Sequence, residues 1–195
     1  MAITTLTCAT GCDDLELPVV GFDECDPEIN LSQLNYAYLA LEDAAVFDDA
    51  SLPEEWALRL SQTATPPADS GTEVVDLIRQ LTIIGDIPAP AATDKDISGG
   101  RKITTKVDRT VNIDIDETSP ENYELARQTE CGFFKCKMWF ETAGAQLLGG
   151  NAGITGKLLL RPIYARGTEE IEKYIGTFTW TSTTSPDRCT SPIAH

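Results

Sequence analysis

Residues 102–116, KITTKVDRTVNIDID, constrain the fold more than any other stretch, because their apolar and polar side chains alternate over fifteen positions. Successive side chains of a β-strand point to opposite faces, so the alternation predicts one long strand with two distinct faces. At about 3.3 Å per residue the strand would span about 50 Å, whereas a compact domain of this chain length is about 42 Å across. We therefore expect the strand to bend or to project, and to complete its sheet with neighbouring subunits.

The two faces of this strand differ in chemistry. The mostly apolar face holds Ile103, Thr105, Val107, Arg109, Val111, Ile113 and Ile115. The polar face holds Lys102, Thr104, Lys106, Asp108, Thr110, Asn112, Asp114 and Asp116. Arg109 is the one charge on the apolar face. It either pairs with a buried acid, which is the commoner case, or marks the point where this face leaves the core for an interface.

Side-chain periodicity elsewhere predicts more strands than helices. Strands are expected at residues 33–41, 133–142, 158–165 and 173–182, and helices at residues 48–62 and 120–130. Residues 74–84 fit a helix or a strand by periodicity, and their β-branched residues favour a strand. Asp49 or Ser51 would cap the first helix, and Ser119 before Pro120 would cap the second. The chain is thus predicted to be mainly β with one or two flanking helices. This is the α+β class, with extended arms and loops.

Proline, glycine and acidic residues suggest the boundaries of the domain. Residues 1–30 are interpreted as an acidic N-terminal arm, residues 31–182 as one β-rich domain, and residues 183–195 as a C-terminal tail. Within the domain, residues 87–100 are rich in Pro, Ala, Asp and Gly and are predicted to form a long connection into the central strand.

The formal net charge of −16 is unevenly distributed. Residues 1–92 hold 17 Asp and Glu against two Arg, net −15, whereas the remainder holds 14 acids against 13 bases. An acidic surface repels phosphate and argues against ordinary nucleic-acid binding through a basic patch. It is compatible with a wall along which DNA slides, or simply with solubility. Neither an apolar run long enough for a membrane span nor a secretory leader is visible, so a cytosolic product is expected.

The six cysteines raise the possibility of a metal site. Cys8, Cys12 and Cys25 supply three of the four ligands usual for zinc, but their spacing is irregular. Reduced thiols, buried or incidental, are the expected state of a chain this long and without a secretory signal. No cofactor is expected, and a cysteine-based metal-binding module is kept as an alternative function.

Catalytic patterns are weak. The only histidine is His195 at the end of the sequence, which disfavours a Ser-His-Asp or Cys-His arrangement. Asp114 and Asp116 share a strand face and could in principle act as acid and base, but an ordinary polar face is the more economical interpretation. The sequence therefore predicts a protein that is not an enzyme.

Three segments resemble the tail tube proteins of tailed bacteriophages. They are SGGRK at residues 98–102, NIDIDETSPENYELARQTE at residues 112–130 and TFTWTSTTSPDR at residues 177–188. The likeness covers about half of the chain, roughly residues 97–192, and does not extend to residues 1–92. It implies an antiparallel β-sandwich or barrel-like subunit with a flanking helix. It also implies a virion protein, made in the host cytoplasm, whose subunits form rings, commonly hexameric, that stack into a tube for DNA delivery.

The same resemblance suggests which residues face the channel. The candidates are Lys102, Lys106, Asp108, Asn112, Asp114 and Asp116, on the polar side of the central strand. The implied partners are further copies of the chain, other virion proteins, and DNA that passes without sequence-specific binding, with no membrane. A neck, tail terminator or capsid-decorating protein is the alternative within virion structure.

Overall fold

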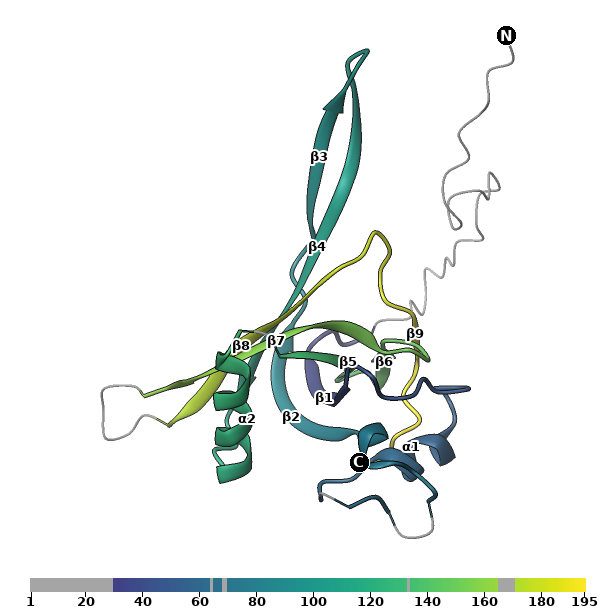
Figure 1. Cartoon of the computed structure of the whole chain (residues 1–195), viewed down its shortest axis with the longest axis vertical. Coiled ribbons are helices and arrows are strands. Elements are labelled where there is room, and N and C mark those ends of the chain that lie inside the picture. Colours follow the sequence, from purple (N-terminus) through teal and green to yellow (C-terminus); the bar gives the residue numbers. More distant parts are fainter. Residues whose placement is uncertain (1–29, 64, 68–69, 133, 165–170) are drawn as a thin grey trace, which may run out of the picture.

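The computed structural model describes residues 30–63, 65–67, 70–132, 134–164 and 171–195 (Figure 1). The strands are β1 (Leu34–Leu41), β2 (Arg79–Asp86), β3 (Ala91–Ile97), β4 (Arg101–Ile115), β5 (Lys135–Thr142), β6 (Gln146–Leu148), β7 (Ile154–Ile163), β8 (Lys173–Thr181) and β9 (Arg188–Thr190). The helices are α1 (Pro53–Arg59), α2 (Pro120–Glu130) and the 3-10 helix η1 (Val74–Asp76). The predicted arm at residues 1–30 lies outside the described residues, apart from its last position.

Six antiparallel strands close into a barrel. Their order is β1-β2-β4-β8-β7-β5, and β5 pairs again with β1 to complete the circle. Closure pairs the edges of the sheet, which removes the open edges that would otherwise attract other chains. Strand β6 extends from β5, and β9 pairs with β6. The mainly β class and the barrel-like subunit are confirmed.

Apolar side chains from one face of the barrel strands fill the barrel. Strand β4 contributes Val111, Ile113 and Ile115, which the alternation placed on its apolar face. Phe140 from β5 and Phe178 from β8 pack against each other in the same core, with ring centroids 5.6 Å apart. Burying a side chain of this size contributes about 1.5–3 kcal/mol, so the inner half of β4 is held firmly in the barrel.

A second apolar cluster lies on the outer side of β1 and β5. Tyr38 and Trp139 from these strands meet Phe47 and Trp56, which are brought over them by the segment around α1. The Trp56 indole N–H donates to the carbonyl of Ala50 at 2.9 Å, which satisfies its one donor inside the cluster. Strands β1 and β5 are therefore buried on both faces, in agreement with the apolar content of both faces of residues 33–41.

Helix α2 has the bounds predicted from its capping residues. The Ser119 hydroxyl accepts a hydrogen bond from the Asn122 N–H at 3.3 Å, and Pro120 occupies the first turn. The helix packs against β7. There the buried Thr129 hydroxyl accepts from the Leu160 N–H at 2.9 Å and donates to the carbonyl of Ala126 at 2.8 Å. This hydroxyl ties the end of the helix to the barrel wall.

The outer half of β4 leaves the barrel and forms a long hairpin with β3 (Figure 1). The prediction of a long connection at residues 87–100 is therefore wrong over Ala91–Ile97. Pairing with β4 imposes an extended conformation that the Ala- and Asp-rich composition does not indicate. Gly99 and Gly100 form the turn at positive φ values of 84° and 71°, a region open to glycine. The expectation that the central strand bends or projects is confirmed.

Two other predicted elements differ from the structure. The helix expected at residues 48–62 is only α1, and its N-cap is Leu52, without a side-chain cap, instead of Asp49 or Ser51. The carboxylate of Asp49 instead accepts from the N–H of Ser51 at 2.9 Å, within the preceding turn. The strand expected at residues 74–84 is divided into η1 and β2, because Arg79 rather than Val74 begins the pairing with β1.

Residues 183–195, predicted as a tail, run back along the barrel. Strand β9 pairs with β6, and Ile193 packs on the second apolar cluster. The His195 ring stacks on Tyr36 with a centroid separation of 3.9 Å.

Candidate functional site

The predicted channel-facing residues divide into two groups along β4. Lys102 and Lys106 lie on the hairpin, beyond the barrel, where both are exposed. Asp108, Asn112 and Asp114 lie on the outer face of the barrel, on the side opposite the core residues. Asp116 follows the end of the strand and is exposed. The alternation read from the sequence thus placed Asp108, Asn112 and Asp114 on one face of the barrel wall, whereas on the hairpin a register shift at Thr105 interrupts the alternation between Lys102 and Lys106.

Most of the charges on the barrel part of this face have partners. The Lys106 ammonium lies 2.8 Å from a carboxylate oxygen of Asp108, and this hydrogen bond holds the pKa of Asp108 below its ordinary value. Lys173 lies 2.8 Å from Asp114 on the neighbouring strand. Asn112 donates to the carboxylate of Asp86 at 3.2 Å. The two ion pairs offset the charges of Asp108 and Asp114, whereas the amide of Asn112 is neutral and leaves Asp86 its negative charge.

Threonines of β8 continue this face beside β4. Thr177, Thr179 and Thr181 lie opposite Asn112, Thr110 and Asp108 in the antiparallel register. The Thr181 hydroxyl donates to Asp108 at 3.0 Å. The face is therefore made of hydroxyls and neutralised charges. It can make weak polar contacts over a large area but does not present a positioned acid and base.

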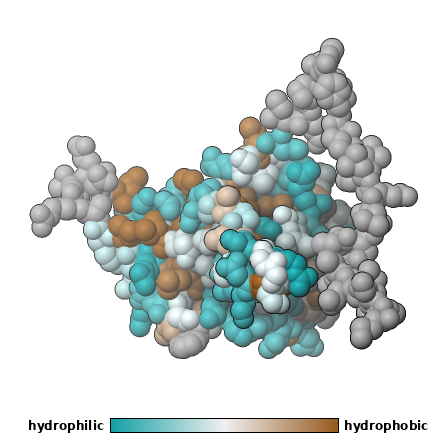
Figure 2. All heavy atoms as spheres, turned by 90° about the horizontal axis from the view of Figure 1, so that it is seen from above, coloured by the Kyte–Doolittle hydropathy of each residue, from teal (hydrophilic) through white to brown (hydrophobic). Residues whose placement is uncertain are grey.

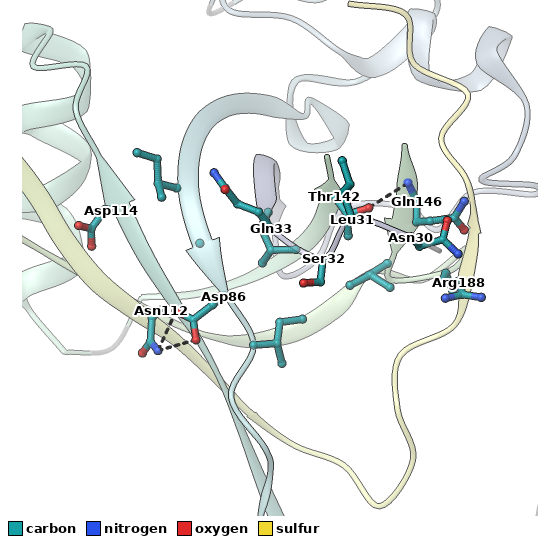
Figure 3. A pocket seen from close by; sticks show the side chains of 15 residues that line it. Asn30, Leu31, Ser32, Gln33, Asp86, Asn112, Asp114, Thr142, Gln146 and Arg188 are labelled. Carbon is teal, nitrogen blue, oxygen red and sulfur yellow. Dashed lines mark hydrogen bonds between the residues drawn. The ribbon is translucent and has the colours of Figure 1, made fainter. Parts of the chain in front are cut away.

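A groove of about 720 Å³ opens next to this face (Figure 3). One side of the groove is formed by β2 and β4 and is lined by Asp86, Asn112 and Asp114. The opposite side is lined by the segment that precedes β1. Leu31 and Ile84, 63 % and 57 % exposed, add apolar surface to it. Amides, carboxylates and exposed apolar side chains allow this groove to contact a partner through both hydrogen bonds and apolar packing. Residues 30–33 were missed by sequence reasoning, since nothing in their pattern indicates that β2 lies beside them.

Arg109 lies half-buried where β4 leaves the barrel. Its guanidinium donates to the carbonyl of Ser182 at 3.2 Å and to the hydroxyl of Ser185 at 3.5 Å. Within the described part of the chain it makes no ion pair, so the favoured interpretation of a buried ion pair finds no partner acid there. Arg109 instead anchors the segment that follows β8, and its role at an interface stays a prediction.

Glu141 is the one acidic or basic residue among the described residues that is buried, with 3 % of its surface exposed. The Tyr38 hydroxyl donates to its carboxylate at 2.5 Å, and Nε2 of His195 lies 3.1 Å from the same oxygen. Burial and the neighbouring carboxylate raise the pKa of Tyr38 far above its ordinary value, so the phenol stays a donor. These three residues fasten the C-terminal segment to the barrel. Sequence reasoning missed the cluster because its members are far apart in the chain.

The cysteines of the described residues do not form a cluster. Cys136 is buried, Cys131 is exposed and Cys189 is half-buried, and no group of three metal-ligating side chains occurs in this part of the protein. Cys8, Cys12 and Cys25, the ligands considered for zinc, lie outside the described residues. No helix in the described ranges is both long and apolar enough to cross a membrane.

The fold and these surfaces define a closed six-stranded antiparallel barrel with a projecting hairpin, a flanking helix and a docked C-terminal segment. Comparisons of the chain with protein-family models, with curated proteins and with solved structures find no match.

Proposed function

We propose that this protein is a structural subunit of a bacteriophage tail tube, which associates with copies of itself into stacked rings, hexameric by the resemblance described above. The observation that carries the proposal is the β3–β4 hairpin, which extends well beyond the barrel (Figure 1). A projection of this kind offers contact surface that a solitary globule does not use.

The physical reason is the cost of a free hairpin. A two-stranded hairpin is marginally stable in water at best, and three or more strands or a packed face are needed to hold it. Among the described residues, the hairpin beyond Val107 has only its own two strands, and Ile103 on its apolar face is 45 % exposed. A neighbouring subunit that covers this face or adds a strand to its edge would supply what is missing.

The outer face of β4 and β8 is the proposed channel lining. Its hydroxyls and paired charges give it little attraction for phosphate, which suits a surface along which DNA slides without being held. In this proposal Asp108, Asn112 and Asp114 line the channel. Lys102 and Lys106 lie on the hairpin, so we assign them to contacts with a neighbour instead. The site of action is the virion, after assembly with other virion proteins in the host cytoplasm.

Negative-stain electron microscopy of the purified protein tests this function. We expect rings or rods of uniform width that become more numerous as the protein concentration rises. Rings that never stack would favour a neck, tail terminator or capsid-decorating protein. Particles that stay monomeric at high concentration, as measured by light scattering in parallel, would contradict the proposal.

A further inference from the structure

We infer that the hairpin of one copy binds the α1 end of the next copy through opposite charges and exposed apolar side chains. The α1 end is defined as residues 46–63 and 70–76, which include α1 and η1. This inference rests on the proposed self-association and adds the two surfaces that meet in it.

The hairpin carries more base than acid on an acidic protein, because Lys95, Arg101, Lys102 and Lys106 outnumber Asp94 and Asp96, and its acids lie on β3 below the turn. Residues 97–106, which include its turn, hold three basic residues and no acid, although the chain as a whole has a net charge of −16. Lys95, Arg101 and Lys102 are exposed and make no ion pair among the described residues. Lys106 alone is paired, with Asp108. Figure 2, which looks onto the hairpin end from above, shows mainly hydrophilic surface at its centre. These free cations are available to a partner.

The α1 end is acidic over its whole described extent. It holds six acids, namely Asp48, Asp49, Glu54, Glu55, Glu73 and Asp76. Its single base, Arg59, donates to the carbonyls of Ala45 and Val46 instead of pairing with a carboxylate. None of the ion pairs between described side chains involves this end. Its negative charge is therefore not neutralised by any ion pair among the described residues.

Hydrogen bonds hold the α1 end together as one surface. The Ala45 N–H donates to the Asp76 carboxylate at 2.6 Å, and the Thr72 hydroxyl donates to the carbonyl of Leu58 at 2.8 Å. The backbone N–H of Ile78 donates to the carbonyl of Arg59 at 2.9 Å. These contacts join the segment before α1, the helix itself and η1. A partner would thus meet a preformed surface.

Apolar side chains are exposed within the same acidic surface. They are Val46, Leu52, Leu58, Val74 and Val75, with exposed fractions between 40 % and 62 %. Ile103 and the half-buried Ile97 provide apolar groups between the cations of the hairpin. Exposed apolar groups next to a net basic charge on the hairpin and a net acidic charge on the α1 end give the complementary surfaces that suit a specific protein interface.

The two surfaces lie toward opposite ends of the long axis of the molecule (Figure 1). One copy therefore cannot bring its own hairpin onto its own α1 end. A contact between unlike surfaces is heterologous, and it leaves a free hairpin at one end of a pair and a free α1 end at the other. Such a contact repeats, which makes it suitable for adding one layer of subunits to the next.

Charge reversal on either surface tests the contact. The hairpin variant carries Arg101→Glu and Lys102→Glu, and the α1-end variant carries Glu54→Lys and Glu73→Lys. We expect each variant alone to associate about 100-fold or more weakly than the wild type, because like charges facing each other cost several kcal/mol. Sedimentation velocity over a concentration series measures the association. A matched control, Glu117→Lys with Glu121→Lys, makes the same charge change on exposed residues at and before α2 and should associate like the wild type.

Mixing the two variants separates this contact from a symmetric one. The intact hairpin of one variant meets the intact α1 end of the other, so an equimolar mixture should regain association but extend by a single layer. All four substitutions in one chain should restore continuous assembly, because both charges are exchanged. Equal association of the wild type and both variants would overturn this inference and leave the proposed function standing. A wild type that never associates would overturn both.

Discussion

Removing the Tyr38 hydroxyl tests the buried anchor of the C-terminal segment. Tyr38 is fully buried, and its hydroxyl donates at 2.5 Å to the buried carboxylate of Glu141. Hydrogen bonds to a charged group contribute about 1.5–3 kcal/mol, and a buried carboxylate that loses a donor is not solvated in exchange. We therefore expect Tyr38→Phe to lower the free energy of unfolding by about 1.5–3 kcal/mol. For a chain of this length the melting temperature would fall by about 3–12 °C.

Urea unfolding followed by tryptophan fluorescence measures this loss. Trp56 has its ring centroid 5.1 Å from that of Tyr38, so the signal reports on the same cluster. Tyr36→Phe is the matched control. The Tyr36 hydroxyl lies on the same strand but has no hydrogen-bond partner among the described residues. Its removal should change the free energy of unfolding by less than about 0.5 kcal/mol. Protein concentration is kept equal, since association shifts apparent stability.

A double-mutant cycle with Glu141→Gln isolates the charge. In the Glu141→Gln background the tyrosine donates to a neutral amide, so Tyr38→Phe should cost only about 0.5–1.5 kcal/mol. A loss from Tyr38→Phe that equals the loss from Tyr36→Phe would refute the anchoring role of the hydroxyl. An equal loss in both backgrounds would refute the part assigned to the charge.

Two further outcomes follow from the barrel. Burial raises the pKa of Cys136 to about 12. Alkylation at pH 8 should therefore modify the exposed Cys131 rapidly and Cys136 only on unfolding, as mapped by peptide mass spectrometry. Equal labelling rates of the two thiols in the native protein would contradict this packing. A Cβ at Gly176 would overlap the carbonyl oxygen of Leu159 on the paired strand. Gly176→Ala should therefore lower the free energy of unfolding by about 3 kcal/mol or more, as measured by thermal unfolding. A loss below about 1 kcal/mol would show that β7 and β8 can separate there.

Local pattern was sufficient for several elements. The alternation of residues 102–116 predicts β4 almost to the residue, because side-chain period two depends only on the strand itself. Ser119 and Pro120 likewise predict the start of α2, since a cap acts within one turn. The six strands of the barrel were all predicted in approximate position, and the mainly β class followed from them.

Pairing between distant segments was beyond the reach of local pattern. Residues 91–97 have a composition typical of a loop and become β3 only because β4 lies alongside to accept their hydrogen bonds. In the sequence, Glu141 resembles any other polar residue at the end of a strand. Its hydrogen-bond partners Tyr38 and His195 lie 103 and 54 residues away in the chain. The groove beside β2 arises in the same way.

By itself, the sequence determined the two faces of the central strand, the capped helix and the excess of acid before residue 93. Only the tertiary structure decided that the sheet closes into a barrel, that the outer half of β4 leaves it, and that basic and acidic ends lie apart on one molecule. The physical reason is that alternation and capping are properties of neighbouring residues. Closure, projection and the separation of charge depend on which strands pair across the whole chain.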